Sequence, residues 1–286
     1  MSELASESCD TSAYSPEWLS LREPADAAAR APQLLEPLRE FLPDDEEVVI
    51  RDLGCGTGSL GRWLAARLPG TQHWILHDHD TALLAHARAG LPRTALDGSP
   101  VDVVTEQRDV TALRAPDLDG TSLVTASALL DLLTKDEVTA LAGAIVGAGC
   151  AALLMLSVDG RVELSPADPL DDEIAAAFNA HQRRITGGRR LLGPAALDVA
   201  ATAFGRLGAT VLRAESAWRL GPDQAELQRQ WLRGWVGAAV EQVPDLLPAA
   251  DVYLQRRLEM AQSHELHAVI HHGDLLVLPP SLEVAA

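Results

Sequence analysis

The chain has 286 residues, 47% of them hydrophobic, which is enough to bury one full core or a core with an insertion. Its formal net charge is −18, from 41 acidic residues against 23 lysines and arginines. A surface this acidic repels phosphate backbones and anionic headgroups. We therefore expect neither nucleic acid nor membrane as a partner, and a small molecule in their place.

Cysteine usage and the N-terminal sequence indicate the compartment. Cys9, Cys55 and Cys150 form no CxxC pair and no metal-ligand spacing, so we expect neither a disulfide framework nor a bound metal. The first twelve residues are polar and lack the apolar stretch of a signal peptide. No apolar run approaches the ~18 residues that span a bilayer. These features predict a soluble, cytoplasmic protein. We expect it to be a monomer or a homodimer.

In chain order, the first expected element is a helical cap over residues 1–45, of which 1–13 are expected to be disordered. Ser15 followed by Pro16 is typical of a helix start, with serine as the cap and proline at the first position. Helical pattern then continues to about Phe41. We expect breaks in it at Pro24 and Pro32.

From Val48 onward, short apolar strands alternate with helices, which predicts a parallel, doubly wound α/β sheet of Rossmann-like type. The expected strands cover residues 48–52, 73–77, 101–107, 122–126 and 150–158. The expected helices cover residues 59–68, 81–89 and 134–146, the last opening with a capping box from Thr134 to Glu137.

After the fifth strand the pattern changes, and two helical insertions are expected at residues 159–192 and 223–262. The first begins with a proline-rich loop and holds a helix near 171–184, and a further helix covers 195–207. A sixth strand begins at Ala209, and a last strand, at 266–278, is expected to run antiparallel to it. The prediction is one domain over 46–286 with a seven-stranded, mostly parallel sheet.

The most informative stretch is a glycine-dense turn between the first strand and its helix. The turn carries Gly54, Gly56 and Gly58 after Asp52. Glycines permit positive φ and close approach of a ligand, and free N–H groups at the helix start favour a polar or anionic group. Read from Gly56 to Gly61, the turn fits the GxGxxG dinucleotide fingerprint, with Asp78 roughly 20 residues later.

Three acids fall at the ends of three successive predicted strands. These are Asp52, Asp78 and Asp109. Ligands of doubly wound sheets bind beyond the carboxyl ends of the strands, so we expect these carboxylates to border one site.

Read two residues earlier, Asp52-Leu53-Gly54-Cys55-Gly56-Thr57-Gly58 resembles motif I of the class I S-adenosylmethionine (SAM)-dependent methyltransferases. The order of later segments, up to Val158 and in the terminal strand pair, resembles that family too. The resemblance implies SAM as cofactor. It implies that Gly54, Gly56 and Gly58 wrap the methionine part of SAM, with Asp52 anchoring the turn.

The resemblance assigns further cofactor contacts residue by residue. Asp78 accepts from the ribose hydroxyls and His79 packs on adenine. Asp109 accepts from the adenine amino group, beside the Val110 backbone, and Ser127 borders the methionine moiety. From the residues alone, Asp109 is also compatible with a cap on the following turn.

The implied activity is methyl transfer to a small organic acceptor. Segment 125–128 reads Thr-Ala-Ser-Ala, without the Asn-Pro-Pro-Tyr of amino-group methylation or a Pro-Cys pair for base-carbon methylation. One alternative is an NAD(P)-dependent oxidoreductase, for which Tyr14, Tyr253 and Lys135 offer no plausible catalytic pair. The other is a SAM-binding scaffold without turnover.

Candidate acceptor residues lie in the insertions. His181 is the first candidate base because histidine titrates near neutral pH, and Asp131, after the fourth strand, is the second. A stripe spaced by four residues carries Trp231 and Trp235, which either pack a helix on the sheet or line a lid over the acceptor. Arginines at 183, 184, 189 and 190 are candidates for an acceptor anion.

Overall fold

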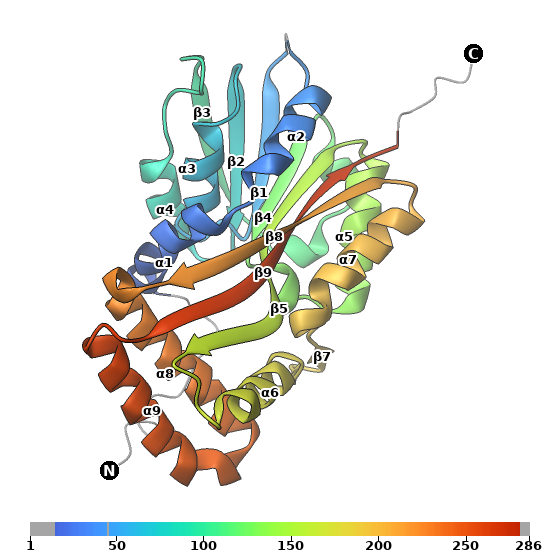
Figure 1. Cartoon of the computed structure of the whole chain (residues 1–286). Coiled ribbons are helices and arrows are strands. Elements are labelled where there is room, and N and C mark those ends of the chain that lie inside the picture. Colours follow the sequence, from blue (N-terminus) through green and yellow to red (C-terminus); the bar gives the residue numbers. More distant parts are fainter. Residues whose placement is uncertain (1–14, 45, 281–286) are drawn as a thin grey trace.

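The computed structural model describes residues 15–44 and 46–280; the segment predicted to be disordered, 1–13, lies outside these ranges. A seven-stranded sheet forms its centre, in the order β3-β2-β1-β4-β5-β9-β8 (Figure 1). The strands are β1 Val48–Leu53, β2 Gln72–Asp78, β3 Val101–Gln107, β4 Leu123–Ser127, β5 Ala151–Ser165, β8 Thr210–Leu220 and β9 His267–Leu278. Strands β1 to β5 pair in parallel, and β9 is antiparallel to both β5 and β8. The predicted fold class is confirmed.

Helices cover both faces of the sheet. They are α1 Pro16–Ala29, α2 Leu35–Phe41, α3 Ser59–Ala65, α4 Thr81–Gly90, α5 Lys135–Gly147, α6 Asp171–Gln182, α7 Ala196–Arg206, α8 Ala225–Gln242 and α9 Leu247–Gln262. On one face, α2, α3 and α4 bury Leu38, Leu64 and Leu84 against the strands. On the other face, α5 and α7 bury Ile145 and Phe204. The N-terminal helices therefore pack directly on the sheet.

The local start signals of two helices are present as predicted. The side chain of Ser15 accepts a hydrogen bond from the Trp18 amide, and Pro16 opens α1. Thr134 and Glu137 form the reciprocal capping box of α5. The break predicted at Pro24 is wrong, because α1 continues through that proline. Contacts between α1 and β8, including a hydrogen bond from Trp218 to Asp26, hold the helix across the missing backbone donor.

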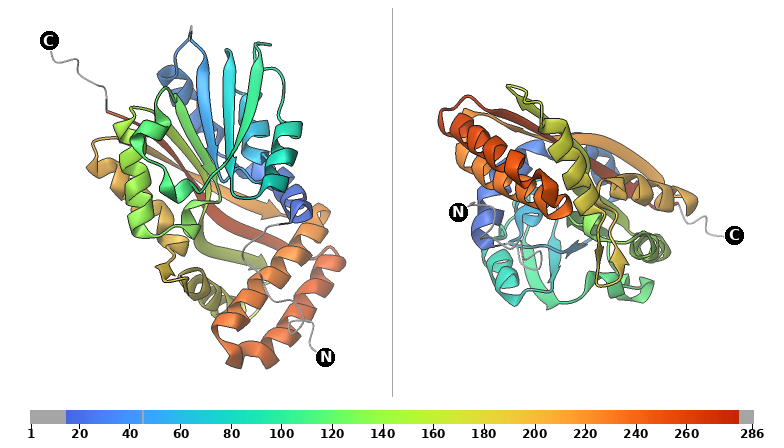
Figure 2. Two further views of the ribbon diagram at one scale, coloured as in Figure 1. Left: turned by 180° about the vertical axis from the view of Figure 1, so that it is seen from behind. Right: turned by 90° about the horizontal axis from the view of Figure 1, so that it is seen from below.

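Strand β5 is longer than the sequence pattern suggested. Residues 159–165, predicted as loop, continue β5 as paired strand, with register shifts between Leu154 and Ser157 and between Val158 and Val162. Because β4 pairs only with residues 151–155 of β5, the rest of β5 projects beyond the parallel strands together with β8 and β9. This projection carries α6, α8 and α9, which lie below the parallel strands in Figure 1 and in the left view of Figure 2. A third core, which includes Ile174, Trp235 and Leu254, holds it together.

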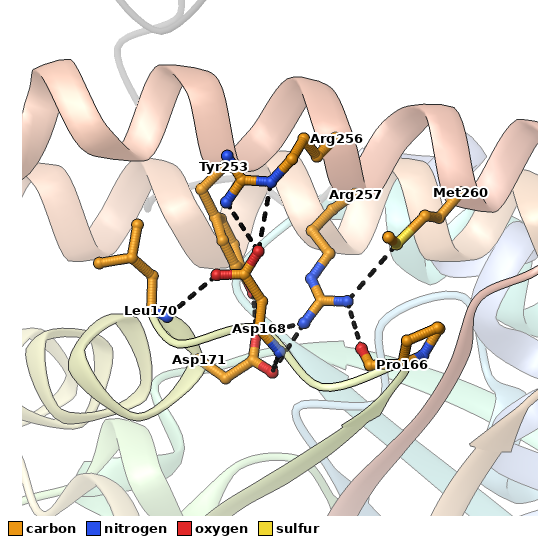
Figure 3. Close-up of polar contacts among 8 residues, drawn as sticks. All are labelled: Pro166, Asp168, Leu170, Asp171, Tyr253, Arg256, Arg257 and Met260. Atoms are coloured by element: carbon orange, nitrogen blue, oxygen red, sulfur yellow. Dashed lines mark hydrogen bonds and ion pairs between the residues drawn. The ribbon is translucent and has the colours of Figure 1, made fainter.

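A buried ion pair ties α9 to the segment that leads into α6 (Figure 3). The Arg257 side chain is fully buried, and its Nη2 donates to both oxygens of Asp171 at 2.5 and 2.7 Å. Its Nη1 donates to the Pro166 carbonyl at 2.6 Å, and the Tyr253 hydroxyl donates to Asp171 at 2.6 Å. The neighbouring Arg256 pairs with Asp168 nearer the surface. The contacts of Arg257 fix the position of α6.

Across residues 15–44 and 46–280, none of the helices combines the length and apolar character needed to cross a membrane.

Replacing Arg257 by Met should destabilise the protein by about 3 kcal/mol, because Asp171 and the Pro166 carbonyl lose their cationic donor in a buried setting. Urea denaturation measures the change. Arg256→Met is the matched control, and should cost under about 1 kcal/mol because its pair is partly exposed. Equal losses in the two variants would contradict a special role for Arg257.

Candidate cofactor and acceptor site

A cavity of about 380 Å³ lies at the carboxyl ends of β1, β2 and β4. Here these strands meet α1 and the projection that carries α6, α8 and α9, called the lobe below. Its volume is that of a small-molecule site. One end is lined by the glycine turn after β1, and the other by α6, α8 and the projecting parts of β5 and β9. The cavity therefore joins the predicted cofactor turn to both predicted insertions.

The glycine turn has the backbone that its sequence predicted. Gly54, Gly56 and Gly58 all have positive φ, of 62°, 54° and 84°. Gly54 and Gly56 line the cavity. Gly58 does not; a Cβ there would meet the Ala87 Cα at 3.1 Å, so this glycine lets α3 and α4 approach closely. Two of the three glycines thus offer bare backbone to a ligand.

Asp52 stands at the end of β1 with half of its carboxylate unused. Its Oδ1 accepts from the Thr125 hydroxyl at 2.8 Å, while its buried Oδ2 has no hydrogen-bond partner among the described residues. Burial raises the pKa of Asp52 to about 7, although the Thr125 hydrogen bond and the nearby Arg30 charge oppose this. A ligand cation at Oδ2 would satisfy this oxygen and keep it ionised.

Arg30, at the end of α1, is a cavity residue that no sequence motif marked. Its side chain is buried, and its Nη2 donates to the Ser59 hydroxyl at 3.0 Å at the start of α3. Burial lowers its pKa, while Asp26, Asp52 and Asp274 oppose that change. The guanidinium thus places a buried positive charge beside the glycine turn.

Asp78, His79 and Ser127 all line the cavity, as expected for a cofactor site. Asp78 Oδ2 accepts from the Gly56 amide at 2.9 Å, and its Oδ1 accepts from the Asp80 amide at 3.0 Å. The carboxylate therefore shapes the turn as well as facing the cavity. His79 is 75% exposed, with Nδ1 3.2 Å from Asp78 Oδ1.

Asp109 and Val110 lie outside the cavity lining. The Asp109 carboxylate accepts from the Thr111 amide at 2.9 Å and from the Thr111 hydroxyl at 2.7 Å, and these bonds lower its pKa. Asp109 is thus the cap of the short turn Val110–Ala112, which was the second interpretation of its position. The adenine contacts predicted for Asp109 and Val110 stay predictions.

The two candidate bases are placed differently. Asp131 lines the cavity, and its buried Oδ1 finds no partner in the part of the chain that the structure describes. Burial raises the pKa of Asp131 to about 6. His181 lies outside the lining, where its Nε2 is 3.0 Å from Glu241 on α8 and burial, with Arg184, lowers its pKa. Asp131 is therefore the base candidate with access to the cavity.

Helix α6 reaches the cavity through neighbours of His181 that sequence reasoning missed. These are Phe178, Asn179 and Gln182. They share the helix with His181 but occupy its adjacent face, and only the packing of α6 on β5 and α8 decides which face is inward. The arginines at 183, 184, 189 and 190 do not line the cavity, and Arg189 instead pairs with Glu137.

Both tryptophans of the predicted stripe line the cavity. The rings of Trp231 and Trp235 stack at 5.0 Å with an angle of 17°. Trp235 is buried in the lobe core, whereas Trp231 is half-buried. The stripe therefore packs in the core and lines the cavity, while its role as an acceptor wall stays a prediction.

Comparison with known proteins adds an independent result. Residues 50–147 match the family described as a methyltransferase domain, and this segment contains the glycine turn, Asp78 and Asp131. No curated protein matches the sequence.

Solved structures similar to this chain include two proteins of low identity. The cyclopropane synthase MmaA2 from Mycobacterium tuberculosis is 11% identical with a TM-score of 0.49, over 92% of this chain and 94% of that one. A SAM-dependent methyltransferase from Geobacter sulfurreducens, solved with S-adenosylhomocysteine, is 17% identical with a TM-score of 0.42, over 93% and 98%. These likenesses carry no functional argument.

The assignment rests on the family match and on the residues of the turn. An acid ends β1, three glycines of positive φ follow it, and a second acid at the end of β2 holds their backbone. Residues 50–147 thus form a methyltransferase domain, and its glycine turn is similar to motif I of the class I SAM-dependent enzymes.

Proposed function

We propose that the protein transfers a methyl group from SAM to a small organic acceptor held between the glycine turn and helices α6 and α8. One observation carries this proposal: the free Oδ2 of Asp52 and the free Oδ1 of Asp131 are buried in the lining of the same cavity. The first suits a cofactor cation and the second suits an acceptor proton. A site for two reactants side by side is what a transfer reaction requires.

The residues present fit SAM. Asp52 would hold the ammonium group of its methionine part, with Gly54, Gly56 and Ser127 beside it. Arg30 is the nearby cation suited to its carboxylate. Asp78 would accept from the ribose hydroxyls and His79 would cover the adenine, while Gly58, Asp109 and Val110 would act from outside the lining.

SAM supplies a methyl group on a positively charged sulfur and leaves as S-adenosylhomocysteine. The protein positions the acceptor's nucleophilic atom in line with that methyl group and excludes water. We propose that Asp131 takes the acceptor proton, because its oxygen is free and its pKa of about 6 leaves it ionised at neutral pH. His181 would act indirectly, by joining α6 to Glu241 on α8.

The volume of the cavity and the net charge of −18 support a small-molecule acceptor over nucleic acid. Cytoplasmic location and a monomeric or homodimeric state stay predictions from the sequence. The NAD(P) interpretation of the glycine turn gives way to the methyltransferase match, whereas a SAM-binding scaffold differs from an enzyme only in turnover.

Isothermal titration should show micromolar binding of SAM and S-adenosylhomocysteine and none of NADH. Asp78→Ala should weaken SAM binding about 100-fold, because two charge-assisted hydrogen bonds and the support of the Gly56 amide are lost. Asp102→Ala, on the exposed side of β3, is the control and should bind as the wild type does. Binding of NADH without SAM would overturn the cofactor assignment.

The pH dependence of kcat/KM should report Asp131. The base works when ionised, so the rate should fall as pH drops below about 6 and reach a plateau above it. Asp131→Asn should lose about 100-fold or more in kcat and lose this acid limb. His181→Ala should keep the limb. If His181→Ala abolishes it and Asp131→Asn does not, the roles are reversed.

Alanine substitutions should separate the two stripe tryptophans. Trp231→Ala should raise the acceptor KM and leave SAM affinity unchanged, because its half-buried ring faces the acceptor end of the cavity. Trp235→Ala should in addition lower stability by about 3 to 5 kcal/mol, because this ring is only 2% exposed. Steady-state kinetics and urea denaturation distinguish these outcomes; unchanged kinetics in Trp231→Ala would leave that ring a packing role only.

A further inference from the structure

The acceptor end of the cavity holds several buried polar atoms without partners. Asn179 Oδ1 and Gln182 Oε1 on α6 join Asp131 Oδ1 as buried hydrogen-bond acceptors that no described residue satisfies. Trp235 Nε1 on α8 is a buried donor in the same state. Buried polar groups are normally paired, so their concentration in one cavity indicates a ligand that pairs them.

The orientation of Asn179 is set by its second hydrogen bond. Its Nδ2 donates to the Gly160 carbonyl at 2.8 Å, and the opposite orientation would set two oxygens against each other. The contact depends on Gly160, where a Cβ would meet Asn179 Oδ1 at 2.8 Å and Pro194 Cγ at 2.9 Å. Asn179 therefore presents an oxygen, and the bulged part of β5 holds it there.

Charge at this end argues against an anionic acceptor. Arg22 is engaged by both oxygens of Asp26, and Arg161 by Asp159 and His271. Burial lowers the pKa of His272 to about 3, so that ring is neutral. Within the described lining, the acceptor end therefore presents no cation free of protein partners, while Asp131 contributes a negative charge.

Much of the remaining lining is apolar, and it combines aliphatic side chains such as Leu132 and Val162 with aromatic rings. Trp231 and Trp235 stack on α8, and Trp18 and Phe178 line the same cavity from α1 and α6. Flat rings of this kind bind a planar, conjugated ligand through large apolar contact. A hydroxyl group on such a ligand both donates and accepts, so it can serve the three free oxygens and the free indole N–H alike.

We propose that the acceptor is a planar, uncharged molecule bearing hydroxyl groups, recognised by Asn179, Gln182 and Trp235 and methylated on oxygen. This rests on the proposed function. The hydroxyl oxygen forms a bond to the methyl carbon, the carbon–sulfur bond breaks with its electron pair staying on sulfur, and the hydroxyl proton passes to Asp131. The products are a methyl ether, S-adenosylhomocysteine and a proton later released to solvent.

The test compares three probes of one shape by isothermal titration, with saturating S-adenosylhomocysteine and above the pKa of Asp131. The probes are 2-naphthol, 2-methoxynaphthalene and 2-naphthoate. 2-Naphthol should bind about tenfold more tightly than its methyl ether, because only the hydroxyl offers a donor to the free oxygens. The anionic naphthoate should bind more weakly still, since Asp131 repels it.

Two variants locate the recognition. Asn179→Leu and Gln182→Met should each reduce the preference for 2-naphthol over the ether about tenfold, with S-adenosylhomocysteine affinity unchanged. Glu173→Gln, on the exposed face of α6, is the matched control and should keep the preference. If Asn179→Leu fails to fold, Gln182→Met and Trp235→Phe carry the same comparison.

The outcomes separate this inference from the proposed function. Three outcomes overturn the inference alone, provided that S-adenosylhomocysteine still binds. The probes bind without any preference, naphthoate binds more tightly than 2-naphthol, or no probe binds at all. A hydroxyl preference that survives in both α6 variants also overturns it. Failure of S-adenosylhomocysteine to bind overturns the proposed function.

Discussion

The rest of the structure depends on the hydrogen bonds that the Asp274 carboxylate in β9 accepts. It is fully buried and accepts hydrogen bonds from the Ala31 amide at 2.9 Å, the Leu156 amide at 2.7 Å and the Ser216 hydroxyl. These donors come from the segment after α1, from β5 and from β8. Burial raises the pKa of Asp274, and the three donors and Arg30 oppose that change. One side chain thus joins three strands to the N-terminal helices.

The hydrogen bond from the Leu156 amide to Asp274 lies where the sheet passes from its parallel part to the antiparallel strands that carry the lobe. Leu156 has a positive φ of 56°, which is costly for a leucine, and it lies in the irregular stretch where β5 shifts register against β9. Asp274 stabilises this backbone at the point where β5 leaves the parallel strands. Leu156 also lines the cavity. The register shift therefore lies where the glycine turn and the helical lobe meet around that cavity.

Electrostatics at the cofactor end follow from one buried cation among buried acids. Arg30 interacts with Asp26, Asp52 and Asp274, so the acids of α1, β1 and β9 share its charge. A buried arginine is tolerated only with such partners. Asp52 nevertheless keeps a free oxygen. The α6 end of the cavity holds the free amide oxygens of Asn179 and Gln182 and the free carboxylate oxygen of Asp131.

The sequence by itself determined the features that depend on near neighbours. The strand–helix alternation, the glycine turn after Asp52, the Ser15 cap and the Thr134 capping box each rest on residues within one turn or one strand. The antiparallel pairing of the last two strands was also predicted, as the layout of the resembled family implies, and β8 and β9 pair in this way. The family match over residues 50–147 confirms what the turn had indicated.

Only the tertiary structure decided the features that join distant segments. Residues 159–165 were predicted as part of a proline-rich loop, yet pairing with β9 makes them strand. On α6, His181 lies within two residues of Asn179 and Gln182, and the sequence does not say which of them faces the cavity. In the fold, His181 contacts Glu241 on α8 and lies outside the cavity lining. Arg30 carried no motif at all. Arg30 lies in the site because folding packs α1 against the start of α3, which buries the guanidinium.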